Sequence, residues 1–118
     1  MPEGPILLVL DDLMFHSKLE AAAGQAGRPV QRIATAEELA AALASPAWPL
    51  VIVDLGWAGG DPIEAVRALR QAAPHGVIIG FYPHVQSGLR EVALAAGCTE
   101  VLPRSAFVQR LPGLLRAA

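Results

Sequence analysis

Apolar residues gather along the chain in short segments that alternate with longer amphipathic stretches. One segment, Val30–Ile33, carries Gln31 and Arg32 and is therefore predicted to be an edge strand. Uninterrupted apolar segments are typical of strands in a parallel sheet that is covered on both faces. We expect four such strands, the last of them weaker: Ile6–Leu10, Leu50–Val53, Val77–Phe81 and Glu100–Leu102.

The stretches between the strands carry the start and stop signals of helices. Thr35 and Glu38 have the spacing of a capping box, and Asp61 before Pro62 is typical of a helix N-cap. Pro112 predicts that the last helix is broken after Leu111. The expected helices run from about Met14 to Ala26 with Gly27 as C′ residue, from Thr35 to Ser45-Pro46, from Asp61 to before Pro74, from Ser87 to Gly97, and from near Ser105.

Strict alternation of strands and helices predicts a (βα)₅ architecture. A chain of 118 residues is too short to close a barrel of eight such units. We therefore expect one domain, residues 1–118, with an open, doubly wound, parallel five-stranded sheet of flavodoxin-like order 2-1-3-4-5. This order places Val30–Ile33 at one edge.

Carboxylates follow two strands that are neighbours in this order. Asp11 and Asp12 follow the first strand, and Asp54 ends the third. The carboxyl ends of these strands border the crevice in which such sheets bind ligands. A cluster of carboxylates suits a hard cation such as Mg²⁺. The alternative is that Asp11 or Asp12 only caps the first helix.

Composition and charge argue against several classes of function. The chain is 53% hydrophobic and 17% charged, with a net charge of -2. No basic patch stands out, so we expect no direct binding of nucleic acid. The apolar runs are too short to span a membrane, the start lacks the basic region of a signal peptide, and a single cysteine suits a reducing compartment. We expect a cytoplasmic protein.

Four stretches in order resemble the receiver domain of bacterial response regulators, over nearly the whole chain. They are "ILLVLDD", "VIVDLGWAGGDPIEAVRALR", "VIIGFYPHV" and "AAGCTEVLPRSAF". The resemblance implies that Asp54 accepts a phosphoryl group. It also implies a Mg²⁺ ion held by Asp54, the carbonyl of Gly56, and Asp11 with or without Asp12.

The resemblance also implies a switchable surface for a partner protein, either a sensor kinase or a separate output protein. This surface would lie around the fourth helix, the fifth strand and the fifth helix, and the resemblance also implies a homodimer through these elements as one form of partner. Its candidate residues are Leu89, Arg90, Val101 and Ser105. Because the fold uses all 118 residues, we expect a stand-alone domain. The sequence lacks a nucleophile–base pair and a phosphate-binding loop, so we do not expect an enzyme.

Several positions depart from the family pattern. Tyr82 stands where receivers have Thr or Ser, and Arg104 stands where they have Lys. Because a guanidinium favours bidentate carboxylate pairing, we predict that Arg104 contacts Asp54 or Asp11. An alternative follows, in which an Asp54–Arg104 ion pair fills the site and the chain is a phosphorylation-independent interaction module.

The end of the first strand can be aligned with the family's two acidic positions in two ways. One gapless register puts Leu10 at the family's first acidic position and Asp11 at the second, which leaves Asp12 as a helix cap. A shift by one residue restores both acids.

Four other residues carry weaker signals. Trp57-Ala58 replaces the family's Met-Pro, and the sequence leaves open whether Trp57 packs in the core or lies exposed as a lid or partner contact. Trp48 is expected to pack at a helix–strand corner, Cys98 to be buried, and His84 to lie on the surface. No phosphate-binding glycine motif is present, which argues against a nucleotide or dinucleotide site.

Overall fold

Strands and helices alternate strictly in the computed structural model, which describes residues 4–44, 48–83 and 88–117. All strands pair in parallel in a five-stranded sheet of order β2-β1-β3-β4-β5, which confirms the predicted topology. The elements are β1 Ile6–Val9, α1 Leu13–Gln25, β2 Val30–Ile33, α2 Ala36–Leu43, β3 Leu50–Asp54, α3 Pro62–Ala72, β4 Val77–Tyr82, α4 Leu89–Ala96, β5 Glu100–Pro103 and α5 Arg104–Ala117.

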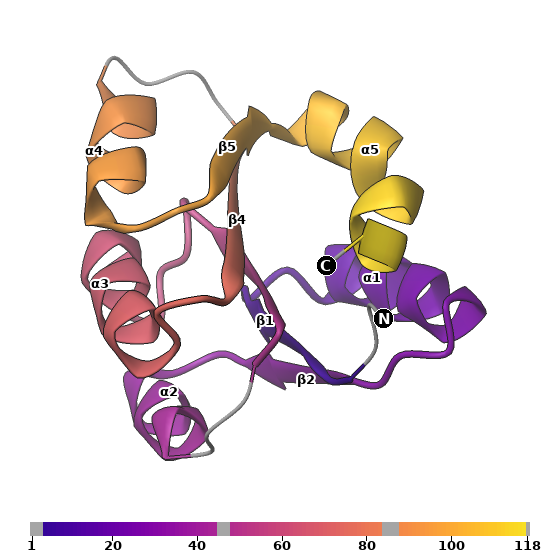
Figure 1. Cartoon of the computed structure of the whole chain (residues 1–118), viewed down its shortest axis with the longest axis horizontal. Helices are drawn as coiled ribbons and strands as arrows, with labels where there is room; N and C mark the ends of the chain where they lie inside the picture. Colours follow the sequence, from indigo (N-terminus) through magenta and orange to yellow (C-terminus); the bar gives the residue numbers. More distant parts are fainter. Residues whose placement is uncertain (1–3, 45–47, 84–87, 118) are drawn as a thin grey trace.

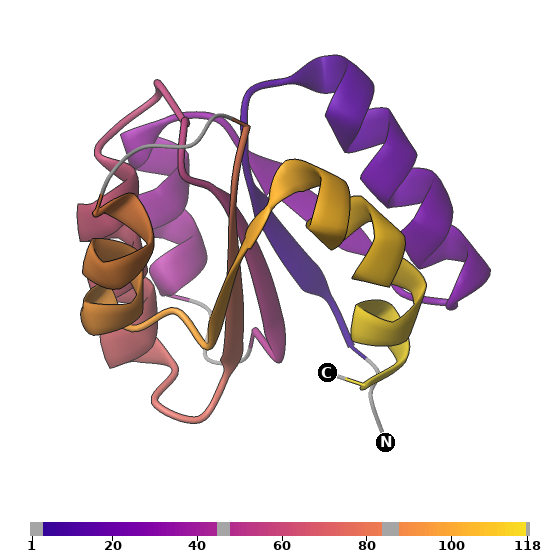
Figure 2. The same cartoon turned by 90° about the horizontal axis from the view of Figure 1, so that it is seen from above.

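Helices cover both faces of the sheet. Figures 1 and 2 show α1 and α5 on one face and α2, α3 and α4 on the other. Successive strand residues point to opposite faces, so Leu7 and Val9 join the core under α2–α4, whereas Ile6 and Leu8 join the core under α1 and α5. Every residue of β1 is buried, which explains why its sequence is apolar throughout.

Three phenylalanines fill the core between the sheet and the helices α1 and α5. The ring centroids of Phe15 and Phe81 are 5.1 Å apart in an edge-to-face arrangement, and those of Phe81 and Phe107 are 4.9 Å apart in a stack. Such aromatic pairs add to the stabilisation from burial alone. The cluster ties the first turn of α1 to β4 and α5, near the carboxyl end of the sheet.

The predicted N-terminal caps of helices α2 and α3 are confirmed. The Thr35–Glu38 capping box is present, and the Asp61 side chain accepts hydrogen bonds from the backbone N–H groups of Ile63 and Glu64. Trp48 and Cys98 are buried as predicted, and burial raises the pKa of the Cys98 thiol to about 11.

One predicted helix break is corrected. Helix α4 begins at Leu89 after Gly88, whose φ of 80° is a left-handed conformation that favours glycine. Helix α5 continues through Pro112, so the predicted break is wrong. Leu111 before the proline and Leu114 and Leu115 after it are all buried, and this packing holds the helix although Pro112 lacks an N–H donor.

Three predictions concern residues outside the part of the chain that the structure describes. The surface position of His84, the start of a helix at Ser87 and the stop at Ser45-Pro46 lie outside the described residues. Among the helices of the described residues, none is both long and apolar enough to cross a membrane.

Candidate functional site

The ends of β1 and β3 lie side by side because Val9 pairs with Val53 in the register of the sheet. Asp54, the last residue of β3, is half-buried, and its Oδ1 accepts a hydrogen bond of 2.8 Å from the backbone N–H of Gly56. Asp11 follows β1, is exposed, and its Oδ2 accepts a hydrogen bond of 3.2 Å from the backbone N–H of Ala58. We call Asp11, Asp54 and the carbonyl of Gly56 the acidic site.

The electrostatics of this site disfavour a charged Asp54. Burial raises the pKa of Asp54 above its ordinary value, and the nearby charge of Asp11 raises it further. The hydrogen bond from Gly56 and the charge of Arg104 act in the opposite direction but do not outweigh burial. An added cation beside the two carboxylates would remove this cost.

Asp12 caps helix α1 and is not part of the acidic site. It is the N-cap of α1, and its Oδ1 accepts a hydrogen bond of 3.1 Å from the backbone N–H of Phe15. That bond, together with Arg104, lowers the pKa of Asp12. Leu10 is fully buried. These positions agree with the gapless register, in which Leu10 replaces the family's first acid and Asp12 is a cap.

Arg104 does not bind the predicted carboxylates. Its Nη2 lies 3.4 Å from Oδ2 of Asp12, and its Cζ lies 4.0 Å from the centroid of the Phe15 ring. The prediction of a contact with Asp54 or Asp11 is therefore wrong. The reason is that the N-terminal end of α1 offers Arg104 both a carboxylate and the face of an aromatic ring, a combination that suits a planar guanidinium.

Tyr82 ends β4 beside Pro103 of β5, its partner in the register. It is half-buried at an open cavity of about 560 Å³ at the carboxyl ends of these strands. The residues that line this cavity are Tyr82, Pro83, Pro103, Arg104, Ser105 and Val108.

The predicted partner surface is corrected at one position. Arg90 and Ser105 are exposed and Leu89 is partly buried, but Val101 is buried with 3% of its area exposed. Because side chains alternate along β5, Val101 points into the core shared with Ala93 and Ala96 and cannot contact a partner.

Trp57 is part of the core and not an exposed lid. Only 3% of it is exposed, and its Nε1 donates a hydrogen bond of 3.1 Å to the carbonyl of Ala34, between β2 and α2. The sequence signal for this position is the pair Gly59-Gly60, which leaves room for an indole ring.

The donor set of the acidic site fits a divalent cation such as Mg²⁺. Mg²⁺ is held by one or two carboxylates, with water completing its shell. Asp11 and Asp54 supply two such carboxylates, and the resemblance to receiver domains adds the carbonyl of Gly56, whose N–H is bonded to Asp54. Within the ranges that the structure describes, no three His, Cys, Asp or Glu side chains gather as a ready-made cage, so most ligands would be water and backbone.

Comparison of the sequence with known proteins finds no family model that matches, and no curated protein matches it either. Comparison of the structure finds many close matches. A response regulator from Burkholderia pseudomallei with a phosphorylated aspartic acid, a calcium ion and citrate is 17% identical, with a TM-score of 0.84; the match covers 97% of this chain and 67% of that one.

Two further structures cover nearly all of both chains. The receiver domain of the sensor histidine kinase PA1611 from Pseudomonas aeruginosa PAO1, with a magnesium ion in its active-site cleft, is 23% identical, with a TM-score of 0.77 and coverage of 97% and 98%. The beryllofluoride-activated NtrC4 receiver domain dimer is 19% identical, with a TM-score of 0.79 and coverage of 98% and 97%. The chain therefore has the fold of response regulator receiver domains.

Proposed function

We propose that this chain is a receiver domain of phosphorelay signalling that accepts a phosphoryl group on Asp54. The observation that carries this proposal is the placement of Asp54. Its carboxylate is half-buried at the carboxyl end of β3, beside Asp11, and within the described residues it has no ion pair. The phosphorylated aspartic acid of the Burkholderia pseudomallei regulator supports this assignment by analogy of fold.

The chemistry required of Asp54 is nucleophilic attack on phosphorus. Oδ1 is oriented by the N–H of Gly56, so Oδ2 is the oxygen that attacks. A bond forms between Oδ2 and the phosphorus of the donor, and the bond between phosphorus and the leaving group breaks. The electron pair leaves with that group, and the product is an acyl phosphate on Asp54.

Asp11, Asp54 and the carbonyl of Gly56 would hold a divalent cation. Bound there, Mg²⁺ would neutralise charge on the transferring phosphoryl group. Asp12 is left out of this set because its two oxygens are engaged by the N–H of Phe15 and by Arg104. The magnesium ion of the PA1611 receiver domain supports a cation at this site.

The signal would pass through a protein partner. A sensor kinase would supply the phosphoryl group, and a separate output protein or a second copy of this chain would bind the surface that contains Leu89, Arg90 and Ser105. The NtrC4 dimer supports the homodimer as one form of this partner. A cytoplasmic location and the absence of an enzymatic activity on other substrates belong to the same proposal.

A second candidate is an interaction module that works without phosphorylation. Arg104 pairs with Asp12 and Phe15 and not with Asp54, so such a module would be held by this pair and not by the Asp54–Arg104 ion pair that the sequence suggested. Tyr82 at the end of β4, where receivers have Thr or Ser, favours this candidate. In this candidate the ion pair and the aromatic ring hold the partner surface in one state.

The test is the intact mass of the protein after incubation with acetyl phosphate, with and without Mg²⁺, beside Asp54→Asn. We expect a gain of one phosphoryl group that requires Mg²⁺ and is absent in the variant. Asp61→Asn is the matched control, because Asp61 caps α3 outside the acidic site and should leave the gain unchanged. A folded protein that gains no mass in any condition would refute phosphorylation and favour the interaction module.

A further inference from the structure

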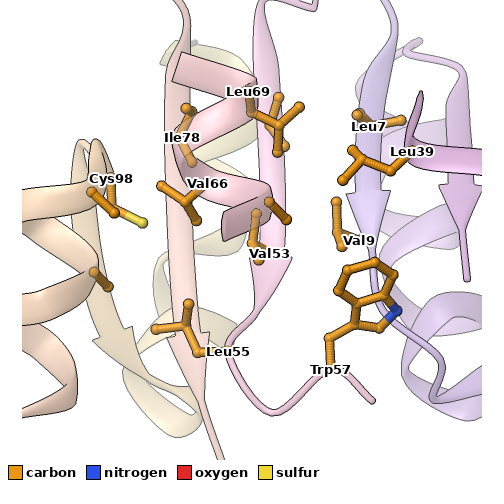
Figure 3. Packing of buried hydrophobic residues seen from close by; sticks show 14 of the residues in the cluster. Leu7, Val9, Leu39, Val53, Leu55, Trp57, Val66, Leu69, Ile78 and Cys98 are labelled. Carbon is orange, nitrogen blue, oxygen red and sulfur yellow. The ribbon is translucent and has the colours of Figure 1, made fainter. Parts of the chain in front are cut away.

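The loop after Asp54 is attached to the neighbouring edge of the domain by Trp57. Figure 3 shows the indole of Trp57 below Val9, on the loop that leaves β3. The ring is buried, and its N–H donates to the carbonyl of Ala34, which follows β2. A loop at the rim of the sheet would ordinarily be exposed, so burial of its largest side chain fixes its position.

Two glycines shape the loop around the indole. A Cβ atom added at Gly59 would lie 1.8 Å from the carbonyl oxygen of Ala34 and 2.7 Å from Nε1 of Trp57. A Cβ atom at Gly60 would lie 2.9 Å from Cζ3 of the same ring. The backbone therefore passes so close to the indole that side chains at these positions would displace it.

The backbone on either side of Trp57 holds the two acids of the site. The N–H of Gly56 donates to Oδ1 of Asp54. The N–H of Trp57 donates to the carbonyl of Asp54 at 3.0 Å, and the N–H of Ala58 donates to Oδ2 of Asp11. Three successive amides are thus aimed at Asp54 and Asp11, and the side chain in the middle of them is the buried indole.

We infer that Trp57 is a positioning residue of the acidic site. By attaching the loop to Ala34, it places the N–H groups of Gly56 and Ala58, and through them the carboxylates of Asp54 and Asp11, before a cation binds. This inference rests on the proposed function for its consequence, the affinity for Mg²⁺. The placement itself exists without a cation and is measured without one.

Trp48 provides a matched control. Like Trp57 it is buried, with 7% of its area exposed, and its Nε1 donates a hydrogen bond of 2.9 Å to a backbone carbonyl, that of Ala42. Both indoles belong to the same core cluster. Trp48 precedes β3, at the end of the strand opposite to Asp54, so Trp48→Phe removes a similar bond without touching the loop.

The first experiment records amide NMR spectra and amide hydrogen exchange of the metal-free protein. In Trp57→Phe we expect the Gly56 and Ala58 resonances to shift and the Ala58 amide to exchange about tenfold faster, as for a segment that opens locally. Gly60→Ala, which displaces the indole but keeps Trp57, should do the same. Trp48→Phe should leave both amides as they are in the parent protein. Unchanged amides in folded Trp57→Phe and Gly60→Ala would overturn the inference.

The second experiment measures the dissociation constant for Mg²⁺ by calorimetry in the same proteins, each shown to be folded by circular dichroism. We expect about a tenfold weaker affinity in Trp57→Phe and Gly60→Ala, typical of the loss of a group that orients metal ligands, and none in Trp48→Phe. If the parent protein binds Mg²⁺, equal affinity in all variants would overturn the inference. A parent protein that binds no Mg²⁺ but shows the amide changes would refute the proposed function and leave the placement by Trp57 supported.

Discussion

The guanidinium carbon of Arg104 lies 4.0 Å from the centroid of the Phe15 ring, and Nη2 of the same group lies 3.4 Å from Asp12. The cation that follows β5 is therefore held by the first turn of α1. Phe15 is in turn fixed by its edge-to-face contact with Phe81. Arg104 still acts on Asp54 through space, because its charge lowers the pKa of that carboxyl.

This relationship predicts that Arg104 opposes a cation at the acidic site. In Arg104→Ala we expect the affinity for Mg²⁺ to rise about threefold, because one nearby positive charge is lost in a partly screened environment. Arg104→Lys keeps the charge and should differ little from the parent protein. Isothermal titration with Mg²⁺ measures both. A lower affinity in Arg104→Ala would mean that Arg104 orients the carboxylates instead of competing with the cation.

The features that the sequence predicted correctly depend on the backbone and on near neighbours. Continuous apolar strands and the alternation with helices predict the sheet order, and the order brings Asp11 and Asp54 to one edge. The capping box at Thr35 is equally local. Each of these signals acts within a few residues or through the regular geometry of a parallel sheet, so a single sequence carries it.

Other features were left open by the sequence or were predicted wrongly from it. These features depend on contacts between side chains of distant elements. Whether Asp12 is a ligand or a cap depends on where α1 begins, within one residue. The partner of Arg104 is set by Phe15, which is brought close only by the packing of α1 against α5. Pro112 is tolerated because Leu114 and Leu115 are buried beyond it. Such contacts override local preference and are not encoded in spacing.

The raised pKa of Asp54 predicts a stability that depends on pH. The folded protein holds this proton at a higher pH than the unfolded chain, so the free energy of unfolding falls as pH rises between the two pKa values. Asp54→Asn removes this penalty, and we expect its thermal midpoint to exceed that of the parent protein by a few degrees at pH 7 without divalent cations. The difference should vanish toward pH 3, where Asp54 is protonated in both states. Thermal melts over this range measure it.

The control is Asp61→Asn, which keeps an N-cap acceptor at the start of α3 and should show no such pH-dependent difference. An Asp54→Asn variant that is less stable than the parent protein at pH 7 would show that the charged carboxylate is favoured by folding, contrary to the effect of its burial.

Arg28 joins the two ends of the described fold. It is buried, its Nε donates to the carbonyl of Gly4 at 3.0 Å, and its Nη1 donates to the carbonyl of Leu115 in α5 at 2.9 Å. Arg28→Met keeps an apolar stem but removes both donors. We expect the free energy of unfolding to fall by about 2–4 kcal/mol, as for buried carbonyls that lose their partners.

Urea denaturation measures this loss, with Arg67→Met as control. Arg67 is exposed on α3 and pairs with Glu64 one turn away, so its replacement should cost less than about 0.5 kcal/mol. Equal stability of the two variants would show that the bonds of Arg28 contribute nothing beyond those of a surface arginine.

Replacing Asp11 and replacing Asp12, the two adjacent acids after β1, should have different effects on the affinity for Mg²⁺. Asp11 lies in the acidic site, where Ala58 N–H orients its carboxylate, whereas both oxygens of Asp12 are engaged at α1. We expect Asp11→Asn to weaken the affinity for Mg²⁺ by at least about tenfold, because a charged ligand becomes neutral. Asp12→Asn keeps the cap and should change the affinity by less than about twofold. Calorimetric titration of both variants decides between them, since a stronger loss in Asp12→Asn would place the second acid, and not the first, among the ligands of the cation.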